Sequence, residues 1–240
     1  MTTIEILDDW YGANAIDYED AWEIQRTLHA QRVADEIGDT AMFLEHPPVY
    51  TAGRRTEPHE RPFDGTRVVD VDRGGKITFH GPGQLVGYPI TKLPSHVLVV
   101  DYVRRVEEAM IRAAADLGVT TGRVQGRSGV WVAASDVRPE RKVGAIGIRV
   151  SRGVTMHGFS INADVDLGFY ERFVPCGIAD AGVTSLSAEV GRDVTVRETA
   201  RAVAPHLAEL LAWEPYTPSP DLAEQVEVGP RVPVGSPVIR

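Results

Sequence analysis

The chain of 240 residues contains a single cysteine, Cys176. One thiol forms no internal disulfide and cannot build a thiolate zinc cage by itself. The longest clean apolar stretches have the length of a strand, well short of the ~18 to 20 residues of a membrane span. The first residues, MTTIEILDDWYG, carry neither the basic nor the apolar region of a secretory signal. We therefore expect a soluble, cytoplasmic, globular protein that does not associate with membranes.

The usual signatures of phosphate and metal binding are also missing. The sequence has no GxxxxGK[ST] loop, and its glycines do not match a GxGxxG that opens a helix. Neither HxH nor HExxH occurs, and His80 and His157 each stand beside a glycine without a partner at metal-ligand spacing. We therefore predict no metal and no cofactor, and we interpret these histidines as hydrogen-bonding residues of a pocket.

The charge of the chain is unevenly distributed. The net charge of −9 argues against a general nucleic-acid binder. Residues 121–160 nevertheless carry seven basic and only two acidic residues. This basic segment is either a solvated face or a surface that attracts an acidic partner.

Lysine is scarce, because Lys76, Lys92 and Lys142 are the only lysines among 25 basic residues. A chain so rich in arginine has a reason to keep lysine where a proton must be released, since a partly buried lysine can lose its proton and arginine cannot. Lys142 leads directly into the apolar run VGAIGIRV, where partial burial is expected. A solvated lysine at a strand end is the alternative.

The hydrophobic pattern indicates one α/β domain followed by a tail. Apolar residues at helical spacing and a capping box at Thr195–Glu198 predict helices, and short apolar runs between turns predict strands of an antiparallel or mixed sheet. The predicted helices cover 17–34, 97–118 and 195–213, and the predicted strands cover 40–46, 67–71, 129–134, 143–150 and 155–162. The last 26 residues hold six prolines and no helical period. We therefore predict a domain at 1–213 and an extended or disordered proline-rich tail at 214–240.

Two loops carry residues suited to chemistry. The segment RGGKITFHGPGQLVGYP (73–89) is rich in glycine and also holds His80, Gln84 and Tyr88, so it is either a tight turn between strands or a loop that approaches a polar ligand. Cys176 lies between Pro175 and Gly177, which favours a loop. Its thiol is either an inert small apolar group or a reactive one.

Four blocks of the sequence resemble, in order, the lipoyl(octanoyl) transferases of the lipoate-protein ligase B family. Residues 73–88 resemble the family's RGGxxTxHxxGQxxxY, residues 142–147 its KxxxIG, residues 155–162 its HGxALN segment, and Pro175–Cys176–Gly177 with Thr184–Ser185–Leu186 its PCG…TSL. Ser160 departs from the common alanine, and the tail has no counterpart that we can place.

The resemblance implies a fold and an activity. The fold is α/β (α+β), a mixed sheet with flanking helices in a single domain, like that of the biotin and lipoate protein ligases and of class II synthetases. The activity is ATP-independent transfer of an octanoyl group from octanoyl-acyl carrier protein. The acceptors are lysines of lipoyl domains of 2-oxoacid dehydrogenases and of the glycine cleavage H protein, in the first step of protein lipoylation.

Carried over position by position, the resemblance also implies site residues. Cys176 becomes the nucleophile and Lys142 its acid–base partner, which lowers the pKa of the thiol. The implied substrate-binding residues are Arg73, Gly74, Gly75, Lys76, Ile77, Thr78, Phe79, His80, Gln84, Tyr88, Ala145, Ile146, Gly147, His157, Gly158, Phe159 and Ser160. We expect the small residues among them to leave room for an acyl chain.

Two other functions remain compatible with these residues. An ATP-dependent lipoate or biotin ligase on the same fold would form an acyl adenylate and need no cysteine nucleophile. A non-catalytic acyl-binding module would keep the fold without the reaction. A relay, in which the octanoyl group comes from another lipoylated protein, is a further possibility for the donor.

Overall fold

The main sheet of the protein is mixed, as expected. The computed structural model describes residues 4–62, 65–172 and 181–227. The strand order is β1-β2-β6-β10-β9-β8-β7, with β11 paired to β9. β1 and β11 run parallel to their partners, and the other described pairs of this sheet are antiparallel. Its strands are β1 (Glu5–Trp10), β2 (Thr40–Leu44), β6 (Gln84–Ile90), β7 (Gly122–Val124), β8 (Arg127–Val132), β9 (Arg141–Ser151), β10 (Val154–Asn162) and β11 (Gly182–Val183).

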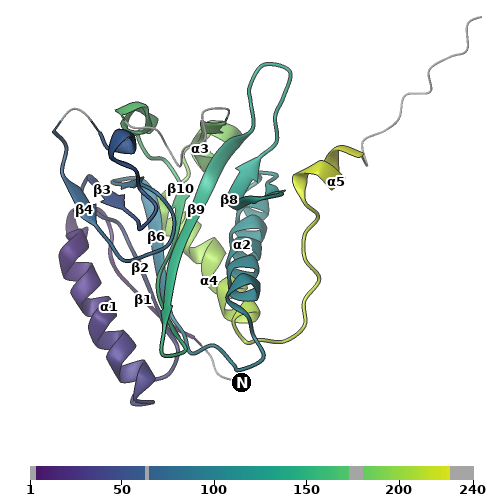
Figure 1. Cartoon of the computed structure of the whole chain (residues 1–240). Coiled ribbons are helices and arrows are strands. Elements are labelled where there is room, and N and C mark those ends of the chain that lie inside the picture. Colours follow the sequence, from purple (N-terminus) through teal and green to yellow (C-terminus); the bar gives the residue numbers. More distant parts are fainter. Residues whose placement is uncertain (1–3, 63–64, 173–180, 228–240) are drawn as a thin grey trace, which may run out of the picture.

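Helices cover both faces of this sheet (Figure 1). α1 (Tyr18–Val33) lies on one face, and α2 (Val99–Asp116) and α4 (Val196–Leu210) lie together on the other. Successive side chains of β2 point to opposite faces of the sheet. Phe43 packs in the core under α2 and α4, while Met42 and Leu44 pack in the core under α1. The buried sheet therefore separates two apolar cores.

A second, small sheet stands beside the first. It has the order β4-β3-β5, with β3 (Val49–Ala52), β4 (Val68–Asp70) and β5 (Thr78–His80). Short helical turns η1 (Gly12–Asn14), η2 (Pro58–Glu60), η3 (Leu167–Arg172) and α3 (Leu186–Val190) connect the larger elements. β5 and β6 flank the turn at 81–83, so the glycine-rich segment links the small sheet to the main one.

Most of the strongly periodic elements match their prediction within a few residues. The three predicted helices are α1, α2 and α4, and the five predicted strands are β2, β4, β8, β9 and β10. Asp17 and Thr195 cap α1 and α4, accepting hydrogen bonds from the amides of Glu19 and Glu198. No sequence pattern had predicted the remaining elements, which are β1, β3, β5, β6, β7, β11 and α3.

The prediction of extended chain after residue 214 is wrong for part of this segment. Leu222–Glu227 form helix α5, and Leu222 is buried. Ser219 binds the buried carboxylate of Glu108 through both its amide and its hydroxyl, at 3.0 and 2.8 Å. Arg123 of β7 also donates to the carbonyl of Ser219, and Gln225 of α5 donates to the carbonyl of Thr121. These tertiary hydrogen bonds order a segment for which the proline-rich sequence has no helical pattern. The division into domain 1–213 and tail 214–240 stays a prediction.

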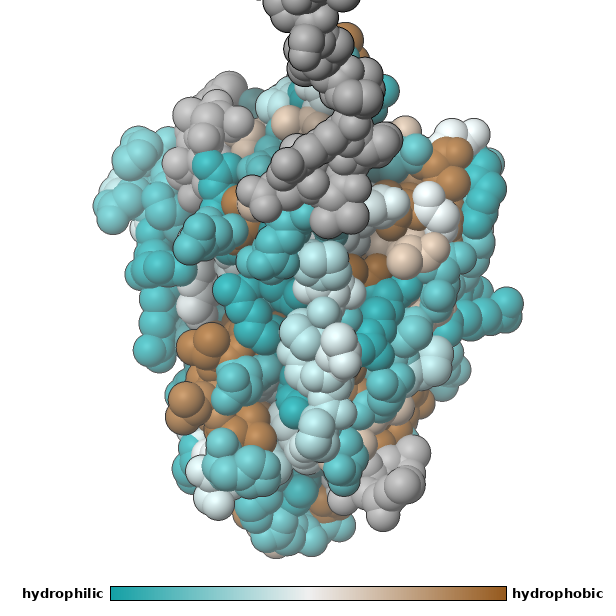
Figure 2. All heavy atoms as spheres, turned by 90° about the vertical axis from the view of Figure 1, so that its right-hand side faces the viewer, coloured by the Kyte–Doolittle hydropathy of each residue, from teal (hydrophilic) through white to brown (hydrophobic). Residues whose placement is uncertain are grey.

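The surface is mostly hydrophilic on the face that Figure 2 shows, with apolar side chains in separate patches. Among the described residues, the exposed large apolar side chains are Leu98, Val99, Val100 and Val137. Within that part of the chain, no helix has the length and apolar character needed to cross a bilayer.

We predict that Leu222→Ala lowers the free energy of unfolding by about 2 to 3 kcal/mol, because it removes a buried side chain that packs on Gly122. Leu98→Ala is the matched control, since Leu98 is 68% exposed and its loss should change stability by no more than about 0.5 kcal/mol. Urea denaturation of the two variants checks this. Equal stability of both would contradict the docking of α5.

Candidate active site

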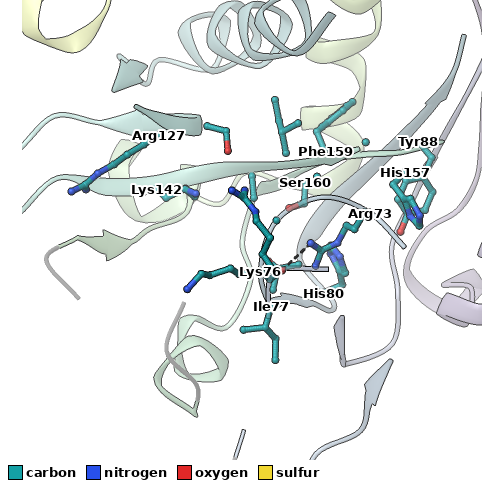
Figure 3. Close-up of a pocket in the computed structure, with 18 of the residues that line it drawn as sticks. Arg73, Lys76, Ile77, His80, Tyr88, Arg127, Lys142, His157, Phe159 and Ser160 are labelled. Carbon is teal, nitrogen blue, oxygen red and sulfur yellow. Dashed lines mark hydrogen bonds between the residues drawn. The ribbon is translucent and has the colours of Figure 1, made fainter. Parts of the chain in front are cut away.

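One cavity, of about 300 Å³, opens between β9, β10 and the glycine-rich segment (Figure 3). It collects most of the residues that the sequence analysis selected. Its lining comprises Tyr18, Arg55, Arg73, Gly75, Lys76, Ile77, Thr78, His80, Tyr88, Gly126, Arg127, Ser128, Lys142, Ala145, Ile146, Gly147, His157, Gly158, Phe159 and Ser160. Residues far apart in the sequence therefore share one space.

The buried guanidinium of Arg73 organises the loop at 73–76. Its Nη1 donates to the carbonyl oxygens of Gly74 and Lys76, at 3.0 and 2.8 Å, and Nη2 donates to the carbonyl and hydroxyl oxygens of Thr51 in β3, at 2.8 and 2.9 Å. The amide of Gly74 also donates to the carbonyl of Ile148 in β9. These hydrogen bonds hold the loop to both sheets. Most of the hydrogen-bonding groups of the Arg73 guanidinium therefore serve to shape the site.

The glycines of the site serve close packing more than they leave room for a ligand. A Cβ on Gly147 would lie 2.9 Å from Cδ of Arg73, and a Cβ on Gly158 would lie 2.1 Å from the carbonyl oxygen of Gly87. At Gly144 the neighbouring space is taken by Met110 and by the carbonyl of Ser160. Glycine at 147 lets the loop at 73–76, here called the arginine loop, approach β9. Glycine at 158 lets β6 approach β10.

His80 is held in one tautomer. Its Nδ1 lies 2.7 Å from Oε1 of Gln84, whose amide nitrogen in turn donates to the carbonyl of Phe79 and to Oδ1 of Asn162. Because the amide oxygen can only accept, Nδ1 of His80 carries the proton and Nε2 keeps its lone pair. His80 therefore contributes to the cavity wall a neutral ring whose Nε2 is a hydrogen-bond acceptor.

His157 occupies an unusual backbone conformation in the middle of β10. Its φ of 55° lies in the left-handed region, which few residues other than glycine adopt. In this conformation its ring is 2.8 Å from the carboxylate of Asp72 through Nε2 and 3.5 Å from the hydroxyl of Tyr18 through Nδ1. Arg149 forms an ion pair with the same carboxylate. His157 thereby fastens the start of the arginine loop to β10.

Burial and the nearby positive charge keep both histidines neutral. Burial, followed by the charge of Arg73 and other cations, lowers the pKa of His157 to about 3. Burial is also the main cause that lowers the pKa of His80 to about 3. The cavity therefore keeps uncharged imidazoles over the physiological pH range.

Lys142 extends from the start of β9 toward the cavity. Its Nζ lies 4.6 Å from the centre of the buried Trp131 ring, and the side chain is half-buried. Its backbone is paired with Val183 of β11, and its carbonyl accepts from the amide of Thr184 at 2.9 Å. Cys176, the other predicted catalytic residue, lies outside the described residues.

Three predicted residues lie behind the cavity lining. Gln84 supports His80, Phe79 stacks on Phe169 with ring centres 4.3 Å apart, and Gly74 joins the loop to β9. The assignment of all these residues to substrate binding stays a prediction.

Some lining residues were missed by the sequence analysis. They are Tyr18 on α1, Arg55 after β3, Gly126 in the turn between β7 and β8, and Arg127 and Ser128 at the start of β8. The basic character of 121–160 pointed to Arg127, but no local pattern marked Tyr18, which reaches the site because α1 packs across β6 and β10. In the described part of the chain, no three His, Cys, Asp or Glu side chains gather as metal ligands.

Comparison with known sequences identifies close relatives. The family model of the lipoyl protein ligase A/B catalytic domain matches residues 17–208. An octanoyltransferase of Salinispora tropica is 64% identical over 199 residues, which cover 83% of this chain and 93% of the relative. An octanoyltransferase of Mycolicibacterium smegmatis is 62% identical over 196 residues, covering 82% and 86%.

Solved structures share the fold at low sequence identity. LipL1 of P. falciparum, in complex with lipoate, has a TM-score of 0.63 at 11% identity and covers 90% of this chain and 64% of its own. A bipartite lipoate protein ligase from Thermoplasma acidophilum has a TM-score of 0.60 at 14% identity, covering 88% and 83%. These likenesses confirm the predicted mixed α+β fold of the lipoate protein ligases.

We predict that the neutral histidines make the protein sensitive to acid. The pKa of His80 in the folded chain lies below its unfolded value of about 6.5, so its contribution to stability is fully present above pH ~6.5 and is lost as the pH falls below it. The slope amounts to at most about 1.4 kcal/mol per pH unit for this residue. His80→Gln should therefore flatten the decrease in unfolding free energy between pH 6.5 and 4.5, as measured by urea denaturation.

The exposed His96 provides the matched control for this measurement. His96→Gln should keep the wild-type pH dependence. A wild-type slope in His80→Gln would show that His80 accepts a proton in the folded protein as readily as in the unfolded chain.

Proposed function

The chain belongs to the lipoyl protein ligase A/B family and acts as an octanoyltransferase in protein lipoylation, and we propose that it carries the octanoyl group on Cys176 with Lys142 as the acid–base group. The observation that carries the proposal is the position of Lys142 in the wall of the cavity that collects the RGG–His80 loop and β9–β10. Figure 3 shows Lys142 facing the same space as Arg73, His80 and Ser160.

The chain on both sides of Cys176 borders this site. Tyr170 and Gly182 each stand six residues from Cys176 in the sequence. Tyr170 donates to Asn162, and Gly182 pairs with Arg141, next to Lys142. This anchoring supports a role for Cys176 beside the lysine.

The first half-reaction exchanges one thioester for another. Lys142 accepts the proton of the Cys176 thiol, and the thiolate attacks the thioester carbonyl of the donor. As the new bond between sulfur and the acyl carbon forms, the bond to the donor sulfur breaks, and Lys142 returns the proton to the departing thiolate. Because the donor is already activated, this step requires no ATP.

The second half-reaction forms the amide. The amine of the acceptor lysine attacks the acyl carbon and gives up a proton to Lys142. The bond to Cys176 breaks, and the thiolate leaves. The amide is more stable than the thioester, so this step drives the overall transfer. Arginine could not serve here because it does not release its proton near neutral pH.

We further propose an acidic acyl carrier protein as donor and lipoyl domains or H protein as acceptors. Five of the described lining residues are arginine or lysine, namely Arg55, Arg73, Lys76, Arg127 and Lys142, and none is aspartate or glutamate. Glu60 and Glu140, outside the lining, pair with Lys76 and Arg127, so the lining keeps a partial excess of positive charge. In a chain with a net charge of −9, this partial excess favours an acidic partner.

We predict that mixing the protein with octanoyl-acyl carrier protein, without ATP, adds one octanoyl group to the wild type and none to Cys176→Ala. Intact-protein mass spectrometry measures this. A lipoyl domain added afterwards should remove the octanoyl group from the enzyme and gain it. Transfer without an adduct would assign the attack directly to the acceptor lysine, and loss of both, with competent substrates, would favour the ATP-dependent ligase or the acyl-binding module.

We predict that Lys142→Arg lowers the rate of transfer by about 10²- to 10⁴-fold, the usual contribution of general acid–base catalysis. The variant keeps the positive charge near Trp131, so it separates proton transfer from charge alone. Lys92→Arg is the matched control, because Lys92 forms a surface ion pair with Asp35. Steady-state transfer assays compare the two, and full activity of Lys142→Arg would exclude the proton shuttle.

A further inference from the structure

Asn162, at the end of β10, binds three other parts of the site through one buried amide. The residue is 4% exposed. Its Nδ2 donates to the carbonyl oxygen of Thr184 at 2.9 Å. Its Oδ1 accepts from Nε2 of Gln84 at 2.9 Å and from the hydroxyl of Tyr170 at 3.1 Å. Both ends of the amide are therefore used, and the contacts fix its orientation.

On the cavity side, this amide supports His80. Gln84 binds Asn162 with its nitrogen and the ring of His80 with its oxygen, at 2.7 Å. The hydroxyl of Tyr170 completes the cluster, because it also lies 2.9 Å from Nε2 of Gln84. A displacement of Asn162 would release the ring that lines the cavity.

On the other side, the same amide holds the chain next to Lys142. Thr184 is bound twice, since its carbonyl accepts from Asn162 and its amide donates to the carbonyl of Lys142. Its hydroxyl donates to the carboxylate of Glu189, which also forms an ion pair with Arg141. Thr184 is thus held to β9 and β10 at the level of the predicted acid–base lysine.

Two of the residues that Asn162 binds flank Cys176 in the sequence. Tyr170 stands six residues before Cys176, and Thr184 stands eight residues after it. One side chain therefore binds the chain on both sides of the cysteine and, through Thr184 and Gln84, contacts the backbone of Lys142 and the ring of His80.

We propose that Asn162 is a positioning residue of the transfer reaction, which sets the chain that carries Cys176 against Lys142. The inference rests on the proposed function of Cys176 and Lys142. Asn162 itself does not touch the reacting atoms. It acts through Thr184 and Tyr170, so its loss should slow acylation much more than it weakens donor binding.

Asn162→Asp tests the proposal with almost no change in size. The carboxylate still accepts from Gln84 and Tyr170, but it cannot donate to the carbonyl of Thr184. Tyr170→Phe removes the hydroxyl contact to Asn162 without adding a charge. Asn14→Asp is the control for the charge, because Asn14 is the other asparagine of the chain and is exposed.

The presence of one cysteine makes the readout specific. Alkylation of Cys176 by iodoacetamide, followed against pH, reports the thiolate fraction of that residue alone. Single-turnover formation of the octanoyl adduct, followed by mass spectrometry against donor concentration, separates the acylation rate from donor affinity. Thermal unfolding shows which variants are folded.

We predict that Asn162→Asp lowers the acylation rate by about 10- to 100-fold while the half-saturating donor concentration stays within about threefold. The alkylation profile of both Asn162→Asp and Tyr170→Phe should shift to higher pH, toward the ~8.5 of an ordinary thiol, with the smaller shift in Tyr170→Phe. Asn14→Asp should match the wild type.

Two results would overturn the proposal. A folded Asn162→Asp with the wild-type acylation rate would do so, and so would a shift in Asn162→Asp alone, with wild-type values in Tyr170→Phe, because charge would then explain it. Should Asn162→Asp fail to fold, Tyr170→Phe decides by the same criteria. The absence of an octanoyl adduct on the wild type, by contrast, would refute the proposed function.

Discussion

The site depends on the burial of one charge, the guanidinium of Arg73. A charge inside a protein is tolerated only when its hydrogen-bonding groups are satisfied. Arg73 meets this condition by binding three carbonyl oxygens and one hydroxyl of the small sheet and its own loop. The same charge, together with burial, keeps His80 and His157 neutral. The shape and the electrostatics of the cavity therefore have a common origin.

The two-layered core explains why the cavity lies where it does. α1 packs on one face of the sheet and supplies Tyr18, while β9 and β10 supply the opposite wall. The small sheet adds the arginine loop, which reaches β9 because Gly147 has no side chain in its path. The fold thus brings neutral imidazoles and several basic side chains to one cavity, an arrangement compatible with the proposed transfer of a neutral acyl chain from an acidic protein.

Sequence patterns located the elements that have strong periodicity or clear caps. The capping box at Thr195–Glu198 marked the start of α4, and the apolar spacing located α1 and α2 to within two residues at each end. β6 was not predicted because glycine and proline interrupt its apolar run. In the structure, the strand is nevertheless buried along its whole length. α5 was not predicted because it is stabilised by contacts with α2 and β7, in particular those of Ser219 and Leu222. Such contacts between distant segments leave no local pattern.

The sequence by itself determined the family, the fold class and the chemical types of the site residues, because the motifs around Arg73, Lys142 and His157 are local and keep their spacing. Only the tertiary structure decided which of these residues line the cavity and which support it, since hydrogen-bond partners such as Asn162 and Thr184 are distant in the chain. The contacts of His157 with Asp72 and Tyr18 likewise depend on folding, since those partners are distant in the chain. A motif specifies which groups are available, and packing decides what each of them contacts.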